Sequence, residues 1–210
     1  MSKHAKSLEK DIMIRIKDND DRWVFTTADF LDLGGRVSIL STLFRMKKAG
    51  ILRQLARGLY DRPRVHATLG VLAATPEAIA AALARRDAVR VQASGAYAAN
   101  LLGISEQVPM KIVFLTDGRA RKVQVGRQQI ILRHTTPRNM ATADRTSGLV
   151  IQALRFTGKR YVTDDVVRRL SNRLDDDSRK QMLADAKYAP AWIAAIMRRI
   201  GTGAEATKTK

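Results

Sequence analysis

The residues of this sequence with the clearest chemical potential are the cationic, hydroxyl and amide side chains between positions 36 and 57. Residues 36–64 hold eight arginines or lysines and a single acid, Asp61. Guanidinium and ammonium groups bind phosphate oxygens, and hydroxyl and amide groups reach base edges or phosphates. This pattern predicts a surface that binds double-stranded DNA. The candidate side chains are Arg36, Ser38, Ser41, Thr42, Arg45, Lys47, Lys48, Arg53, Gln54 and Arg57.

These side chains suggest two kinds of contact. Arg45 could hydrogen-bond guanine with both arms of its guanidinium, a contact that discriminates bases. Lys47, Lys48, Arg53 and Arg57 fit phosphate contacts, which position a protein on DNA without specifying sequence. The alternative is a solvated face on a domain that binds protein. The absence of acids from the outward face of residues 36–57 favours DNA, because a merely solvated face usually mixes both signs of charge.

A second basic surface is predicted further along the chain, where no acid occurs between Asp117 and Asp144. It could extend a DNA-binding footprint or hold an acidic partner. The alternative is that its side chains only cover an exposed sheet with their aliphatic stems. The residues concerned are Arg119, Arg121, Lys122, Arg127 and Arg133.

Other residues that could suggest catalysis or metal binding have simpler interpretations. His4, His66 and His134 have no second ligand at metal-binding spacing. Asp175-Asp176-Asp177 fits a helix N-terminus better than a magnesium site. Ser94 has no histidine or lysine tied to it by a motif, so we expect a helix cap rather than a nucleophile. We therefore predict no catalytic residues, no metal and no cofactor, and a protein that is not an enzyme.

Composition agrees with a polyanionic partner. The 210 residues carry 38 lysines and arginines against 20 acids, a formal net charge of +18. Clustered cations gain free energy by releasing counterions from a phosphate backbone, although a merely basic protein would share this balance. The chain has no cysteine, no apolar signal core near its start and no stretch long enough to span a bilayer. We expect a cytoplasmic protein without membrane contact.

The elements that must position the basic side chains follow from periodicity and turn residues. We predict a helix over 5–18, a short strand at 23–25, a short helix over 28–33 and a third helix over 36–49. Two strands should follow within 51–60, joined at or just before Arg57-Gly58. In the third helix, Ile39, Leu40, Leu43, Phe44 and Met46 should face inward. This order predicts a winged helix-turn-helix domain over residues 1–65.

Residues 66–200 are predicted to form a second, mixed domain, so that the whole chain is α+β. Thr75-Pro76 should start a helix that runs to residue 86, and a helix from 95 to 103 follows a possible strand at 89–91. Strands at 110–116, 122–125 and 129–134 should form a small antiparallel sheet, with Asp117-Gly118 as a hairpin turn. Four further helices follow residue 142. Residues 201–210 should form a flexible tail.

Two segments resemble a known family. Gly50-Ile51-Leu52-Arg53-Gln54-Leu55-Ala56-Arg57-Gly58-Leu59-Tyr60 is similar to the winged-helix end of AbiEi-type antitoxins of type IV toxin–antitoxin systems. Residues 94–103, with Val108-Pro109 and the run 115–118, resemble the second domain of a compact branch of that family. The resemblance covers residues 5–140 and leaves the later helices without a counterpart.

The resemblance implies a repressor that binds operator repeats upstream of its own operon and neutralises a toxin with a nucleotidyltransferase fold. The chain is shorter than the larger family members, so part of the antitoxin surface could be missing. Two alternatives therefore stay open: a stand-alone winged-helix regulator, and a targeting subunit of a nucleic-acid enzyme.

Overall fold

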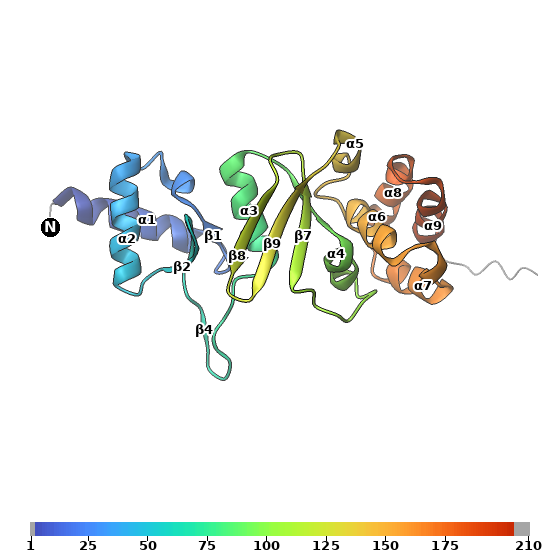
Figure 1. Cartoon of the computed structure of the whole chain (residues 1–210), viewed down its shortest axis with the longest axis horizontal. Coiled ribbons are helices and arrows are strands. Elements are labelled where there is room, and N and C mark those ends of the chain that lie inside the picture. Colours follow the sequence, from blue (N-terminus) through green and yellow to red (C-terminus); the bar gives the residue numbers. More distant parts are fainter. Residues whose placement is uncertain (1–2, 204–210) are drawn as a thin grey trace, which may run out of the picture. The chain divides into compact units, whose positions relative to one another are not determined.

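The computed structural model describes residues 3–203, with side chains from Ser7 onward, and has the predicted mixed α+β class (Figure 1). From residue 204 on, the predicted tail lies outside the described residues. The chain divides into two compact units. Unit 1 contains residues 1–88 and 123–130, and unit 2 contains residues 89–122 and 131–210. Unit 1 thus extends beyond the domain boundary predicted at residue 65.

Unit 1 begins with the predicted order of elements. Its sheet has the strand order β1-β3-β2, and both pairs are antiparallel. The predicted helix over 28–33 is only a four-residue 3-10 helix, closed at its start by a capping box between Thr26 and Asp29. The elements are α1 (Lys3–Asp18), β1 (Val24–Phe25), η1 (Thr27–Phe30), α2 (Arg36–Lys48), β2 (Arg53–Ala56) and β3 (Leu59–Asp61).

The core of unit 1 lies between α1, α2 and this sheet. Ile12 and Ile16 of α1 are buried, as their spacing predicts. The rings of Phe25 and Phe30 meet edge to face, 5.4 Å apart, an arrangement that aromatic pairs favour. The buried members of this cluster are Ile12, Ile16, Phe25, Phe30, Ile39, Leu43, Met46, Leu52 and Tyr60.

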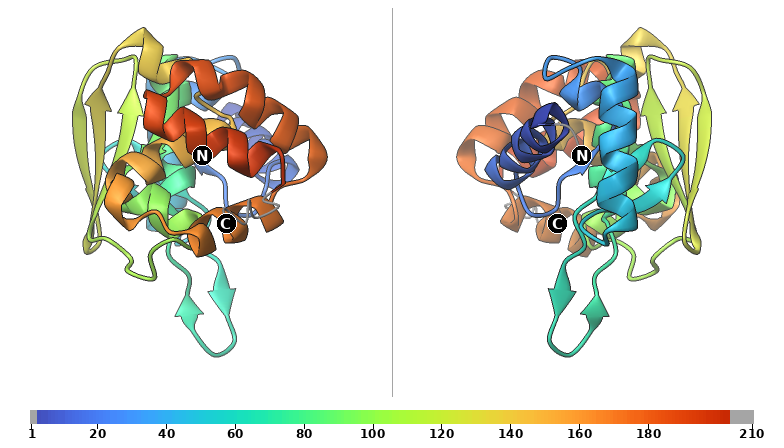
Figure 2. Two further views of the ribbon diagram at one scale, coloured as in Figure 1. Left: turned by 90° about the vertical axis from the view of Figure 1, so that its right-hand side faces the viewer. Right: turned by 90° about the vertical axis from the view of Figure 1, so that its left-hand side faces the viewer.

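Unit 1 also contains a hairpin, a helix and residues 123–130, which belong to two strands of the largest sheet. The strands β4 (Val65–His66) and β5 (Gly70–Val71) form an exposed antiparallel hairpin that projects from the rest of unit 1 (Figures 1 and 2). The helix α3 (Pro76–Asp87) starts at the predicted Thr75-Pro76. It is tied to β1, because Arg85 donates to the carbonyl oxygen of Val24 at 2.7 Å.

The largest sheet differs from the predicted three-stranded meander. It has four strands in the order β6-β7-β9-β8, so β9 lies between β7 and β8. Asp117-Gly118 is therefore not a hairpin turn between paired strands; Asp117 instead binds Arg90. The strand predicted at 89–91 corresponds to β6, which begins later in the chain, at Val91. The bounds are β6 (Val91–Ser94), β7 (Lys111–Thr116), β8 (Arg121–Val125) and β9 (Gln128–His134).

Helices make up the rest of unit 2. α4 and α6 approach closely through Ala98, Ala99 and Ala153, and the helices after α5 share a core around Leu154, Val167 and Met197. Gly148 allows close packing, since a Cβ there would lie 2.1 Å from the carbonyl oxygen of Thr142. The elements are α4 (Gly95–Leu101), α5 (Pro137–Met140), α6 (Thr146–Thr157), η2 (Lys159–Tyr161), α7 (Asp164–Asn172), α8 (Asp176–Asp185), η3 (Ala186–Tyr188) and α9 (Ala191–Gly201).

Within residues 3–203, no helix is both long enough and apolar enough to cross a membrane.

Candidate nucleic-acid interface

The helix α2 buries a different set of side chains from the one predicted. Ile39, Thr42, Leu43 and Met46 face the core. Leu40 and Phe44 were expected to face inward, but they are 40% and 52% exposed. Each residue lies about 100° around the helix from its predecessor, so the centre of the buried face passes through 39, 43 and 46 and leaves 40 and 44 at one side. The prediction that Leu40 and Phe44 face the core is wrong.

The outward side of α2 carries positive charge and no negative charge. Of the predicted DNA-binding residues, Arg36, Ser38, Ser41, Lys47 and Lys48 are exposed there. The helix sequence from 36 to 48 contains no acid. Such a surface attracts phosphates, and its hydroxyl groups can donate to base edges or phosphates.

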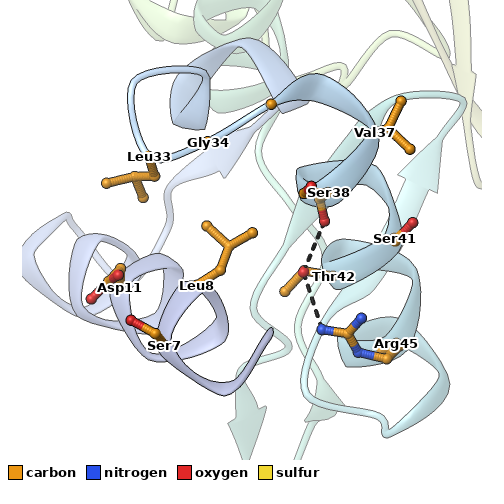
Figure 3. A pocket seen from close by; sticks show the side chains of 11 residues that line it. Ser7, Leu8, Asp11, Leu33, Gly34, Val37, Ser38, Ser41, Thr42 and Arg45 are labelled. Atoms are coloured by element: carbon orange, nitrogen blue, oxygen red, sulfur yellow. Dashed lines mark hydrogen bonds between the residues drawn. The ribbon is translucent and has the colours of Figure 1, made fainter. Parts of the chain in front are cut away.

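Thr42 and Arg45 do not belong to that exposed side. Thr42 is 1% exposed, and its hydroxyl donates to the carbonyl oxygen of Ser38 at 2.9 Å. Arg45 is half-buried and donates from Nη2 to the Thr42 hydroxyl at 3.1 Å (Figure 3). The prediction that Thr42 contacts DNA is therefore wrong. The bond to Thr42 uses one of the N–H donors of Arg45, so the predicted contact with guanine would have to use the remaining donors.

The same residues line a groove of about 520 Å³ between α1 and α2 (Figure 3). Ser7, Leu8 and Asp11 line it from α1, and Ser41 and Arg45 from α2. The Nε of Arg45 is buried and has no hydrogen-bond partner among the described residues. Arg45 therefore lies in this groove, together with Ser38 and Ser41 of the same helix.

The turn between β2 and β3 presents a further cation beside α2. Arg57 and Gly58 form the two-residue turn that the sequence predicts, and Arg57 is exposed. Gly58 has a φ of 75°, a left-handed conformation that favours glycine. Lys47 of α2 donates to the side-chain oxygen of Gln54 at 2.7 Å, which links the helix to β2. Lys47 and Gln54 are therefore neighbours on one surface, and Arg57 is exposed in the turn that follows β2.

Arg53 has a structural role instead of the predicted phosphate contact. Its Nε donates to the Asp61 carboxylate at 2.9 Å, and its Nη2 donates both to that carboxylate and to the carbonyl oxygen of Leu72 at 2.9 Å. Asp61 is 6% exposed. The carboxylate, by hydrogen bonding, raises the pKa of Arg53 above its ordinary value. Arg53 neutralises a buried acid and is committed within unit 1.

The predicted second basic surface is not a single face. Arg119, Lys122, Arg127 and Arg133 are exposed, whereas Arg121 is half-buried and has an interaction of its own. Arg121 and Lys122 are neighbours in β8, and successive side chains of a strand point to opposite faces of a sheet. The two residues cannot contribute to the same flat contact.

The acidic and hydroxyl groups considered for catalysis have structural partners. Asp175 caps α8 by accepting from the Ser178 amide at 2.7 Å. This bond is the main cause that lowers the pKa of Asp175. Ser94 occupies the N-cap position of α4, but its hydroxyl makes no capping bond and instead lies 3.4 Å from the side-chain oxygen of Gln152. Among the described residues, no histidine and carboxylate cluster could hold a metal ion.

Two features of this region were not identified from the sequence. The first is the group of exposed apolar side chains on α2, of which Leu40 and Phe44 are predicted to face inward and Val37 has no predicted role. The second is the hairpin β4–β5, for which the sequence predicts no element. The signal that could have revealed it is the pair of β-branched residues Val65 and Val71, which are partners on either side of the turn at 67–69.

Comparisons with known proteins place the chain in a family. A search of curated proteins finds no match to the sequence. Residues 11–182 match a family described as a family of unknown function, DUF6088. Because this match covers most of unit 1 and most of unit 2, the chain belongs to the DUF6088 family.

Proposed function

We propose that unit 1 is a winged helix-turn-helix that binds double-stranded DNA, with α2 in the major groove and the β2–β3 turn beside it. The observation that carries the proposal is the outward side of α2, which presents Arg36, Lys47 and Lys48 without any acid. The order α1-β1-η1-α2-β2-β3 with its three-stranded sheet supports it, since winged helices place a helix before a two-stranded wing.

The exposed groups suit separate tasks on DNA. In the proposed complex, Lys47 and Lys48 of α2 and Arg57 of the β2–β3 turn bind the phosphates that border the groove. Ser38 and Ser41 are on the helix itself and can hydrogen-bond base edges or phosphates. The major groove is about 12 Å wide, which admits one α-helix. In this arrangement the cations fix position and the helix surface reads the bases.

Lysine protection tests where DNA binds. The full chain is mixed with a random pool of 25-base-pair duplexes, and the bound fraction is amplified through several rounds. The chain is then acetylated with and without a selected duplex, and lysine modification is measured by mass spectrometry. We expect Lys47 and Lys48 to be protected and Lys159, an exposed lysine of unit 2, to react equally in both samples. Unchanged reactivity of Lys47 and Lys48 in the presence of saturating duplex would refute the proposal.

The cellular role we propose is that of a transcriptional repressor and antitoxin, and it rests on the resemblance to AbiEi-type antitoxins. The division into two units supports it, because unit 2 has its own core and could bind a protein partner. The test is co-expression with the neighbouring gene. Growth arrest by that gene alone, relieved by this chain, is the expected result. A neighbouring gene that is harmless would leave the stand-alone regulator or the enzyme-targeting subunit as the better role.

A further inference from the structure

The outward side of α2 contains an apolar stripe among its cations. Val37, Leu40 and Phe44 are 77%, 40% and 52% exposed. They lie three and four residues apart, so they line one side of the helix, together with Ser41. Large apolar side chains on a surface cost free energy in water, and a contiguous group of them indicates a contact site.

The surroundings of this stripe favour nucleic acid over protein. Lys48 places its ammonium nitrogen 5.1 Å from the centre of the Phe44 ring, and Arg36 precedes Val37 directly. The centres of protein–protein interfaces are depleted in charged residues, and lysine in particular is rare there. The phosphate groups of DNA, by contrast, would form ion pairs with Lys48 and Arg36. The charge complementarity therefore points to DNA as the occupant.

We propose that Val37, Leu40 and Phe44 read thymine through its 5-methyl group in the major groove. The inference rests on the proposed function of unit 1 and names the base that its helix prefers. Thymine is the only DNA base that presents a methyl group in that groove, and apolar side chains are its natural contacts. Cytosine in the same place would present hydrogen instead, and its amino group would find no acceptor on these three side chains.

The spacing of the three side chains limits where the thymines lie. From Val37 to Phe44 the helix rises about 10 Å, at 1.5 Å per residue. Base pairs are stacked about 3.4 Å apart. The methyl groups should therefore fall within about three consecutive base-pair steps, on either strand.

Replacing thymine by deoxyuridine tests this directly, because it removes the methyl group and leaves the hydrogen-bonding groups in place. The probe is the duplex selected from the random pool, with each thymine replaced in turn, and affinity is measured by fluorescence anisotropy on the full chain. We expect a loss of about fourfold per contacted methyl group, the value of burying one such group. The sensitive thymines should cluster, and the other positions should show no loss.

Alanine variants connect each methyl group to a side chain. Each of the variants Val37→Ala, Leu40→Ala and Phe44→Ala should lose the preference for thymine over deoxyuridine at one of the sensitive positions. At that position, the variant should have the same affinity for the duplex with thymine and the duplex with deoxyuridine. Val108→Ala is the matched control, because Val108 is a 65% exposed apolar residue of unit 2. It should preserve the full thymine preference. Thermal melting monitored by circular dichroism verifies that each variant is folded.

The outcomes separate this inference from the proposed function. Tight binding to the selected duplex with no effect of deoxyuridine at any position would overturn thymine reading and leave DNA binding intact. No binding to any duplex would overturn both. Dissociation of an oligomer by Phe44→Ala in sedimentation velocity, together with equal affinity for thymine and deoxyuridine, would identify the stripe as a contact between copies of the chain and overturn the inference.

Discussion

At the scale of single residues, the partner of a cation decides its role. Arg53 and Arg57 are four positions apart on one hairpin, and both were predicted to bind phosphate. Arg57 lies in an exposed turn, whereas Arg53 binds the buried carboxylate of Asp61 and a backbone carbonyl. Removing the cation of a buried ion pair is costly in folding free energy, because it leaves an uncompensated negative charge inside the protein.

Substitution of the two arginines should therefore have different effects. Arg53→Ala should lower the free energy of unfolding by about 3 kcal/mol. This value is at the lower end of the range of about 3 to 5 kcal/mol for breaking a buried ion pair, because the Arg53 side chain is 28% exposed. Arg57→Ala should change it by less than about 0.5 kcal/mol and weaken DNA binding. Urea denaturation measures the first effect and anisotropy the second. Equal stability of the two variants would contradict the assignment of Arg53.

The sequence predicted residue types better than residue partners. The cap at Thr75, the turn at Arg57-Gly58 and the buried Ile12 and Ile16 follow from local rules, and the structure has them. The pairing of Arg53 with Asp61 depends on the register between β2 and β3, which a count of charges does not contain. The exposure of Phe44 depends on which side of α2 packs against the core, and the apolar residues of 36–48 are too widely distributed around the helix to fix that side from the sequence.

At the scale of elements, short polar contacts fix how strands begin and end. Asp117 follows β7 and accepts from the backbone amide of Arg90 at 2.8 Å and from its Nε at 2.9 Å, just before β6. The antiparallel pair β6–β7 thus has a clamp at one end. The backbone hydrogen bond is the main cause that lowers the pKa of Asp117 below its ordinary value of 3.8, and the Arg90 guanidinium adds to it.

This clamp should make stability depend on pH. Because the pKa of Asp117 is lower in the folded state, its ionised form stabilises the fold above about pH 4, and that contribution is lost as the pH falls through the folded pKa. Asp117→Asn keeps an oxygen acceptor but removes the charge. It should be less stable than the original chain at pH 6, and the difference should shrink between about pH 5 and pH 3. A difference that stays constant over this range in urea denaturation would exclude the clamp.

At the scale of the whole molecule, the charge of +18 is less informative than its placement. Unit 2 also carries exposed cations, such as Lys159 and Arg160 of η2, and these do not share the outward side of α2. A protein that bound DNA only through its total charge would respond equally to the loss of any cation. A protein that binds through α2 and the β2–β3 turn would respond to the cations of those two elements and not to cations of unit 2.

The salt dependence of DNA binding tests this central claim most directly. Each cation that contacts a phosphate contributes about 0.9 to the slope of log affinity against log salt concentration. We expect Arg36→Gln, Lys47→Gln and Lys48→Gln together to reduce that slope by about 2 to 3 units. The double variant Lys159→Gln and Arg160→Gln should leave it unchanged. Slopes that fall in proportion to the charge removed, wherever it lies, would contradict binding through α2.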